Sequence, residues 1–303
     1  MQVPQDKYFR FLCVIFMIEL RTCNYSRINE IIGLIEDADL DSGVRIGLGS
    51  EGCVHKLPPT GEIARVAGLD CIDGVTLVTP ITPQKHYDRC VAYLGEVADL
   101  GVGDLRIVVN DLGILYSCEI DRPIAGRGIV HTSEACPWVD HILRDESDYV
   151  RNAYLQTNLN YSRTYALLRK MGIAGIEVDL LPRTIAAARM LDIPVYAHFG
   201  YAVVAYARSC HTARFHRKTP PECMHLCNSP MELELREIFD LESLSFAPPD
   251  ADVEEVFPTL YLLGNTIYMK SDFCDAAGVD GVIVNCDMHA PSSKILYEML
   301  TLV

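Results

Sequence analysis

Short β-rich runs alternate with helical patterns along most of the chain, and this alternation limits the fold more than any other feature of the sequence. Apolar residues recur at helical spacing in Ser26–Ile35, Pro83–Leu100, Ser162–Met171 and Thr184–Leu191. A strand–helix–strand repeat predicts a parallel sheet with right-handed crossovers. The predicted strands are Arg10–Ile18, Val44–Leu48, Val75–Thr79, Leu105–Asn110, Tyr154–Leu159, Gly175–Leu180, Ile193–His198 and Thr259–Leu263.

About eight such units are the number that closes a barrel, so we predict an α/β fold: a single TIM-like (β/α)8 barrel over residues 1–303. An open, doubly wound sheet is the alternative. No GxGxxG motif follows the first run and no GxxxxGK[ST] motif occurs, so dinucleotide and P-loop folds lack support. We expect an insertion over about 123–148 and a cysteine-rich loop over about 208–252, which would be the functional segment.

Composition and charge narrow the class of protein. Half of the residues are hydrophobic, and 26 Lys and Arg stand against 41 Asp and Glu, a net charge of −15 that disfavours binding of nucleic acid. The apolar run Phe11–Ile18 follows Lys7 and Arg10 like a signal peptide, but no small-residue cleavage site follows it. It is also too short to span a bilayer. We therefore expect a buried first strand, no membrane span and a cytoplasmic protein.

Three of the twelve cysteines form the sharpest motif. Cys210, Cys223 and Cys227 have the spacing C-x12-C-x3-C, and soft thiolates select zinc or iron–sulfur clusters. Zinc sites usually show two tight pairs of ligands, whereas here there is one tight pair and one distant cysteine. A histidine from the same segment would have to complete a zinc site. The spacing favours an iron–sulfur cluster, with zinc and unrelated buried thiols as alternatives.

The segment that ends in the first of these cysteines resembles the signature of peptidase family U32. It reads GYAVVAYARSC from Gly200 to Cys210, with Ala205 and Tyr206 at the offsets of that signature. Cys223 and Cys227 fall where the family places two more cysteines. The segments GNTIYMKS and GVDGVIVN extend the resemblance, which is closest to the short UbiU/UbiV-type iron–sulfur branch and to its UbiV-like members. Understood members of the family carry a [4Fe–4S] cluster and support oxygen-independent hydroxylation.

The resemblance also implies a ligand set. Val203 stands where the longer family signature has an additional cysteine, so a fourth ligand must come from elsewhere. UbiV-like members take it from a cysteine after an early strand, and the segment IGLGSEGC, which ends at Cys53, is similar to that context. The implied ligands of the [4Fe–4S] cluster are thus Cys53, Cys210, Cys223 and Cys227. Cys71 and Cys136 are the alternatives for the fourth position.

The function implied by the resemblance is oxygen-independent hydroxylation of a small aromatic or quinone-type substrate. Prephenate would be the oxygen donor, and a homologous U32 protein would be a partner. Three alternatives stay open: a U32-type peptidase, a noncatalytic partner subunit stapled by a cluster or zinc, and an RNA-base hydroxylation factor. No GxSxG and no HExxH motif supports the peptidase.

Polar residues near the ends of predicted strands are the candidates for proton transfer. Glu177 and Asp179 alternate with apolar neighbours, so both point to the same side of their strand. An acid inside the barrel would have a raised pKa suited to proton transfer, although a pair of salt-bridged structural carboxylates would show the same pattern. His198 is either a general acid or base or a hydrogen-bonded histidine at a strand end.

Overall fold

The computed structural model of the chain describes residues 17–38, 43–207, 209–218, 223, 225–234, 258–272, 275–290, 292 and 294–295. The strands are β1 Met17–Thr22, β2 Val44–Gly49, β3 Gly74–Val78, β4 Leu105–Val109, β5 Ile124–Ala125, β6 Gly175–Asp179, β7 Val195–His198, β8 Tyr201–Tyr206, β9 Met231–Leu233, β10 Leu260–Leu263, β11 Thr266–Lys270 and β12 Gly281–Asn285. The α-helices are α1 Ile28–Asp37, α2 Thr60–Ala67, α3 Tyr87–Ala98, α4 Leu112–Ser117, α5 Val139–Ile142, α6 Asp148–Leu155, α7 Ser162–Lys170, α8 Pro182–Ala188 and α9 His211–Phe215.

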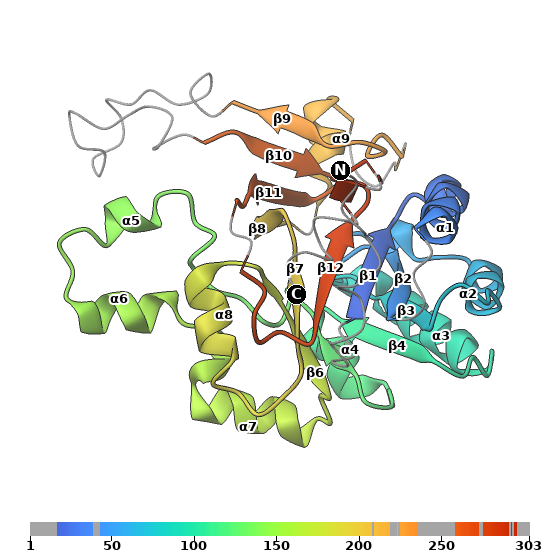
Figure 1. Cartoon of the computed structure of the whole chain (residues 1–303), viewed down its shortest axis with the longest axis horizontal. Helices are drawn as coiled ribbons and strands as arrows, with labels where there is room; N and C mark the ends of the chain where they lie inside the picture. Colours follow the sequence, from blue (N-terminus) through green and yellow to red (C-terminus); the bar gives the residue numbers. More distant parts are fainter. Residues whose placement is uncertain are drawn as a thin grey trace, which may run out of the picture.

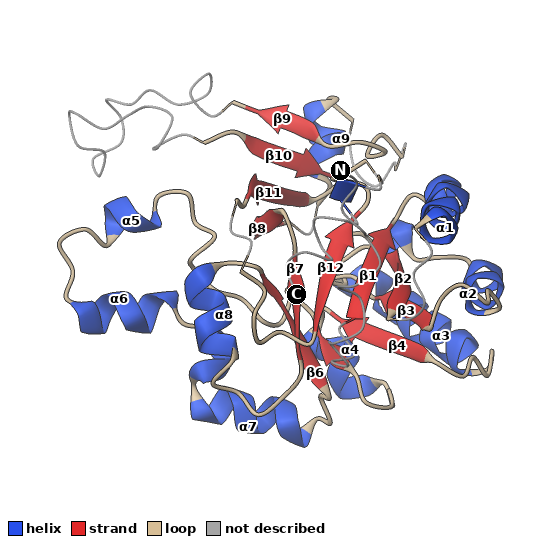
Figure 2. Cartoon of the chain, viewed as in Figure 1, coloured by secondary structure: helices blue, strands red, loops and turns tan. Residues whose placement is uncertain are grey.

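Eight parallel strands form a closed barrel in the order β1-β12-β7-β6-β5-β4-β3-β2. This confirms the predicted TIM-like (β/α)8 architecture. Strands β1, β2, β3 and β6 are buried along their whole length, as expected where helices cover the outside and side chains fill the inside of a parallel barrel. Figure 2 shows the helices arranged around the outside of these strands.

Each outer helix buries one apolar stripe against the barrel. In α1 the stripe is Ile28, Ile31 and Ile35, which follow helical spacing and are at most 1% exposed. In α3 the corresponding residues are Cys90, Leu94 and Val97. The face of each strand that points into the barrel carries largely polar side chains. Glu19 and Arg21 of β1, Thr76 of β3, and Glu177 and Asp179 of β6 are all buried.

A second, four-stranded antiparallel sheet lies between β7 and β12 in the sequence and has the order β8-β11-β10-β9. Figure 1 shows it above the barrel, on the side toward which β12 points. Several contacts attach it to the C-terminal ends of barrel strands. Among them, Val203 N donates to Asp179 (3.2 Å), Ser271 Oγ to the Leu180 carbonyl (3.2 Å), and Arg127 to the Tyr201 carbonyl (3.4 Å). The second sheet thus covers the face of the barrel on which active sites of such barrels are built.

Two predicted strands are wrong in detail. Tyr154–Leu159 is the end of α6 and the start of a 3-10 helix, and the fifth barrel strand is the two-residue β5, inside the segment predicted as an insertion. Thr259–Leu263 corresponds to β10 of the second sheet, whereas the eighth barrel strand is β12. The two errors have different causes. The two-residue β5 has no periodicity by which it could be identified, and an apolar β-rich run such as Thr259–Leu263 is typical of a strand in either sheet.

Two of the predicted segments lie partly outside the described residues. The first strand begins at Met17, and residues 10–16 of the predicted Arg10–Ile18 strand lie outside the described residues. The part of the expected cysteine-rich loop that follows residue 234 also lies outside them. Among the described residues, no helix is long and apolar enough to cross a membrane.

Candidate functional site

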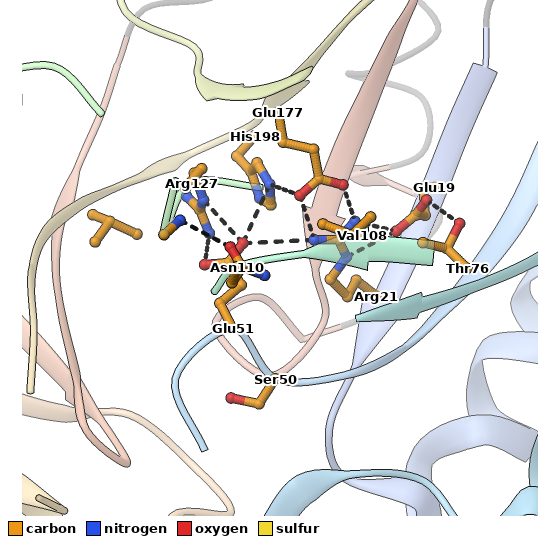
Figure 3. A network of polar contacts seen from close by, with 12 residues as sticks. Glu19, Arg21, Ser50, Glu51, Thr76, Val108, Asn110, Arg127, Glu177 and His198 are labelled. Carbon is orange, nitrogen blue, oxygen red and sulfur yellow. Dashed lines mark hydrogen bonds and ion pairs between the residues drawn. The ribbon is translucent and has the colours of Figure 1, made fainter. Parts of the chain in front are cut away.

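Seven charged or titratable side chains meet inside the C-terminal half of the barrel, and we call them the buried ion network (Figure 3). They come from β1, β6, β7 and the loops after β2 and β5, and each is at most 7% exposed. The network consists of Glu19, Arg21, Glu51, Arg127, Glu177, Asp179 and His198.

Arg21 holds one side of the network together. Its Nη1 and Nη2 donate to the two oxygens of Glu177 at 2.9 and 2.5 Å. Its Nε and Nη2 also donate to Oε1 of Glu19 at 2.8 and 2.5 Å, and Nη1 lies 3.5 Å from Glu51. A planar guanidinium with five donors can serve several carboxylates in this way, which an ammonium cannot do with the same geometry.

Arg127 holds the other side. Its Nε and Nη2 donate to the two oxygens of Glu51 at 3.0 and 2.8 Å, and its Nη1 donates to Asp179 at 2.6 Å. The hydroxyl of Tyr206, on β8, donates to the same Glu51 at 2.6 Å. Glu51 therefore links the barrel interior to the second sheet.

Small residues make room for these charges. An added Cβ at Gly47, on β2, would collide with Oε1 of Glu19 and lie 3.1 Å from two atoms of Arg21. The neighbouring Thr76 hydroxyl donates to Glu19 Oε2 at 2.7 Å, so both oxygens of this fully buried carboxylate have partners. Burying a charge without such partners would cost several kcal/mol.

His198 lies between two glutamates. Its Nε2 is 3.1 Å from Glu177 Oε2 and 3.5 Å from Glu51 Oε1. A carboxylate can only accept, so Nε2 carries a proton. Glu51, Glu177 and His198 offer three ligand atoms within 4.8 Å of one another. Because Arg21 and Arg127 already engage both oxygens of both glutamates, we assign this group to the ion network and not to a metal centre.

The pKa values of the network follow from burial opposed by charge. At Glu51, burial raises the pKa, but Arg127, then His198 and Arg21, outweigh it, and the pKa is lowered. At Asp179, burial outweighs Arg127, and the pKa is raised. Burial, and after it Arg127, holds the pKa of His198 well below its ordinary value, which keeps the imidazole neutral near pH 7.

A narrow cavity of about 30 Å³ opens above the network. Arg21, Glu51, Arg127 and His198 line it together with three cysteines, Cys23, Cys53 and Cys227. Its volume corresponds to about one water molecule. The cavity therefore brings the ion network next to the predicted cluster ligands.

All four predicted ligands line one second cavity of about 140 Å³, which we call the cysteine cavity. Cys53 comes from the loop after β2, and Cys210 directly precedes α9. Cys223 and Cys227 come from the loop between α9 and β9. Three histidines, His55, His86 and His225, lie around the same cavity. Residues separated by more than 150 positions thus converge, as the sequence predicted for Cys53 and Cys210.

The residues of the cysteine cavity fit a metal–thiolate group. Two buried polar atoms in its lining, Thr212 Oγ1 and Asn265 Oδ1, have no hydrogen-bond partner in the described part of the chain. No carboxylate is among its described lining residues, although the chain has 41 of them. Soft sulfur donors without hard oxygen donors are the set that zinc and iron–sulfur clusters select.

Burial and mutual repulsion shape the thiols. Burial raises the pKa of Cys53 to about 11; a hydrogen bond from the His55 backbone opposes this rise, and Cys227, Cys223 and Cys210 add to it. At Cys227, burial again raises the pKa, Lys56 lowers it, and Cys210 and Cys223 raise it. Cys210 Sγ accepts from Ala213 N at 3.3 Å and donates to the Gly264 carbonyl at 3.5 Å. The four thiols are therefore close enough to influence one another.

Gly200, the first residue of the signature segment, has a steric reason to be glycine. It follows β7 with a φ of +80°, and a Cβ there would enter the imidazole ring of His289. That ring stacks on Phe199 with centroids 5.9 Å apart and contacts Tyr201 edge to face at 4.8 Å. The glycine lets the chain turn sharply from the barrel into the second sheet.

The two alternative ligands do not reach the cavity. Cys71 precedes β3 and so lies at the opposite end of the barrel, and Cys136 packs against Val139, Leu143 and Leu155 near α5. Of the candidates for proton transfer, His198 contacts Glu177, and Asp179 joins the same network through Arg127. The sequence patterns did not point to Glu51, Arg21 or Arg127. Of these, only Arg21 carried a signal that could have identified it, because it alternates with Glu19 in an otherwise apolar strand.

The fold and the site define a (β/α)8 barrel with a thiol-lined cavity above a buried ion network. In the comparisons with known proteins, no family model matches this chain, and no curated protein matches it.

Proposed function

We propose that the chain is an iron–sulfur protein of the U32 type. In this proposal Cys53, Cys210, Cys223 and Cys227 hold a [4Fe–4S] cluster, and the protein supports oxygen-independent hydroxylation of a small aromatic or quinone-type substrate. One observation carries the proposal: four cysteines from distant parts of the chain line one cavity, and two of them also border the narrow cavity above the ion network.

The spacing of the thiols supports a cluster over a single zinc ion. A tetrahedral zinc site with Zn–S bonds of about 2.3 Å places its sulfurs roughly 3.8 Å apart. Among the described residues, no three cysteine sulfurs lie within 4.8 Å of one another. Four sulfurs on one cavity with a wider separation suit a larger group, such as the cubane that four cysteine ligands hold.

A bound cluster would supply one-electron chemistry that no side chain performs unaided. The chain's own residues would manage protons beside it. His198 Nε2 holds a proton against Glu177, and burial raises the pKa of Asp179 on the other side of the network. Cys53, Cys227 and His198 all line the narrow cavity, so the proposed ligands and the imidazole face one small space.

Substrate and partner follow from the resemblance and belong to the same proposal. A small molecule, with prephenate as oxygen donor, suits a chain with a net charge of −15 better than an RNA base does. A homologous U32 protein would be the partner, and the cytoplasm the compartment. A U32-type peptidase has little support, because no cysteine thiol hydrogen-bonds a histidine ring among the described residues.

One observation favours a second candidate, a noncatalytic subunit that holds a cluster for its partner. The narrow cavity of about 30 Å³ has no room for an aromatic ring, and the ion network satisfies its own charges. In this case the partner would bind the substrate, and this chain would deliver electrons to it.

The test begins with protein purified without oxygen. We expect a brown protein with about four iron and four sulfide per chain. Serine at any of the four ligands should remove most of the iron, whereas Cys71→Ser and Cys136→Ser should retain it. A colourless protein with one zinc per chain would overturn the cluster.

Function is tested in a deletion strain grown without oxygen. Loss of a hydroxylated quinone or a modified nucleoside would support hydroxylation, and restoration by the wild-type gene but not by Cys223→Ser would tie it to the cluster. Restoration by a His198→Gln variant would favour the noncatalytic subunit over the enzyme. Unchanged quinones and nucleosides, together with peptide cleavage by the purified chain, would overturn the proposal.

A further inference from the structure

A lysine is buried next to the cysteine cavity. Lys56 ends the 3-10 helix Val54–Lys56, three residues after Cys53, and it is only 6% exposed. It borders the narrow cavity together with Cys23, Cys53 and Cys227. Lysine is almost never buried to this degree unless its charge is paired.

No partner among the described residues neutralises this charge. Within the ranges that the structure describes, no carboxylate forms an ion pair with the Lys56 ammonium and no acceptor hydrogen-bonds it. Asp287 borders the same cavity, but its oxygens accept from the Thr22 hydroxyl at 2.7 Å and from Cys23 N at 2.6 Å. An unpaired ammonium is unfavourable to bury, so a counter-ion is expected.

The groups on which the lysine acts are thiols. Burial raises the pKa of Cys227, and Lys56 is the strongest influence that lowers it again. At Cys23, burial raises the pKa and so does Asp287, while Lys56 opposes them. Lys56 therefore lines the same narrow cavity as Cys23 and Cys227 and is close enough to influence both thiols.

We propose that Lys56 is the counter-ion of an anionic metal–thiolate group in the cysteine cavity and that its positive charge raises the reduction potential of that group. The inference rests on the proposed function, because it needs the four thiolates to hold a redox-active cluster. A cluster with four thiolate ligands is anionic and gains a further negative charge on reduction. A fixed positive charge at its edge stabilises the reduced form more than the oxidised form.

The experiment compares Lys56→Met, Lys56→Arg and the wild type, with Lys85→Met as the matched control. Lys85 borders the wider cavity but is exposed, so water screens its charge. Three quantities are measured for each protein: the thermal midpoint of the metal-free form, the iron retained during anaerobic dialysis against a chelator, and the midpoint potential of the cluster.

Lys56→Met should stabilise the metal-free protein but weaken the binding of the cluster. Lys56→Met removes an unpaired buried charge, so the metal-free protein should unfold at a temperature roughly 2 °C or more higher. The same variant should lose iron several-fold faster. At a fixed potential the ratio of oxidised to reduced cluster should rise tenfold, which is a decrease of about 59 mV for one electron. Lys56→Arg should retain the wild-type potential, as should Lys85→Met.

Two results would overturn the inference. If the wild type holds a cluster and Lys56→Met leaves its potential and its iron retention unchanged, the lysine is not its counter-ion, although the proposed function stands. If the wild type takes up neither iron nor cobalt(II) at its thiols, the proposed function and this inference fail together. A merely structural role would lower the thermal midpoint of both forms of Lys56→Met, and that outcome would also overturn it.

Discussion

Arg21 and Glu177 are 156 residues apart in the sequence, yet they form a bidentate ion pair inside the barrel, with N–O distances of 2.9 and 2.5 Å. Both side chains are at most 5% exposed. This pair joins the first strand of the barrel to the sixth, across the interior. It makes the centre of the barrel a charged layer where branched aliphatic side chains are the usual filling.

Replacement of Arg21 by Met should destabilise the folded chain strongly. It leaves Glu19 and Glu177 buried without their main cation, and breaking one side of a buried ion pair costs about 3–5 kcal/mol. Urea denaturation at pH 7 measures the loss. Arg65→Met breaks the exposed pair with Glu62 and should change stability by less than about 1 kcal/mol. Equal losses in the two variants would contradict the role assigned to the ion network.

Acid should destabilise the protein from about pH 6.5 downward because of His198. The folded chain keeps this imidazole neutral, whereas the unfolded chain protonates it below its ordinary pKa of about 6.5, so the unfolded state binds more protons there. The contribution is at most about 1.4 kcal/mol per pH unit. His198→Gln should flatten the stability curve between pH 6.5 and 5, and the exposed His131→Gln should leave it unchanged. An unaltered slope in His198→Gln would show that this imidazole is charged in the folded state.

Below pH 4.5 the two acids bound by Arg127 should act in opposite directions. Glu51 has a lowered pKa, so its stabilisation is present above about pH 4.5 and is lost as the pH falls through its lower folded value. Asp179 has a raised pKa, so its contribution is complete below about pH 3.8 and is lost as the pH rises through its folded value. Glu51→Gln should therefore reduce the acid sensitivity, and Asp179→Asn should increase it. Carboxyl titration followed by NMR checks both directions.

Serine at Cys223 should release the metal and leave the barrel folded. Cys223 belongs to the loop between α9 and β9, outside the closed barrel, and the barrel core does not contain it. Iron content should fall by most of its value, the segment from Cys210 onward should become sensitive to protease, and the far-UV circular dichroism should change little. Cys118→Ser, a thiol at the end of α4, is the control. Global unfolding of Cys223→Ser would mean that the cluster is part of the core.

Alanine at Gly47 and at Gly33 should have opposite effects. At Gly47 the new Cβ enters the space of Glu19 and Arg21, so the network must shift, and overpacking of this kind costs about 1–3 kcal/mol. At Gly33, within α1, nothing lies within 4 Å of the new atom, and alanine should stabilise the helix by roughly 0.5–1 kcal/mol. Chemical denaturation of the two variants gives both values. A neutral Gly47→Ala would indicate more free space beside Arg21 than the structure has.

The parts of the fold that the sequence predicted are those with a strong period. β2, β3, β4, β6 and β7 and the main outer helices lie within a few residues of their predicted ranges, because one apolar stripe or one buried run is enough to identify each. β5 could not be predicted, since its two residues are held by neighbours and not by a pattern of their own. The β10 run looked like a barrel strand because burial in either sheet selects the same residues.

The candidate site divides in the same way. Cys210, Cys223 and Cys227 were predicted from spacing, and Cys53 from the resemblance, and the cavity brings all four together. Glu51 and Arg127 were missed because each lies in an irregular loop, where a charged residue is ordinarily solvated. Only the closure of the barrel, which brings the ends of β2, β5 and β6 around one interior, turns these loop charges into buried partners.

The position of the second sheet between β7 and β12 also sets the order in which the chain can fold during translation. Thr22 at the end of β1 and its partner Asp287 after β12 are separated by 265 residues. At about 5–20 residues per second, a ribosome needs roughly 10–50 s to make the chain between them. Throughout that time β1 has an open edge, where another nascent chain can pair. The proposed ligands Cys210, Cys223 and Cys227 emerge before that edge closes. On the proposed function, a cluster would be loaded into an open barrel, which β12 would then seal.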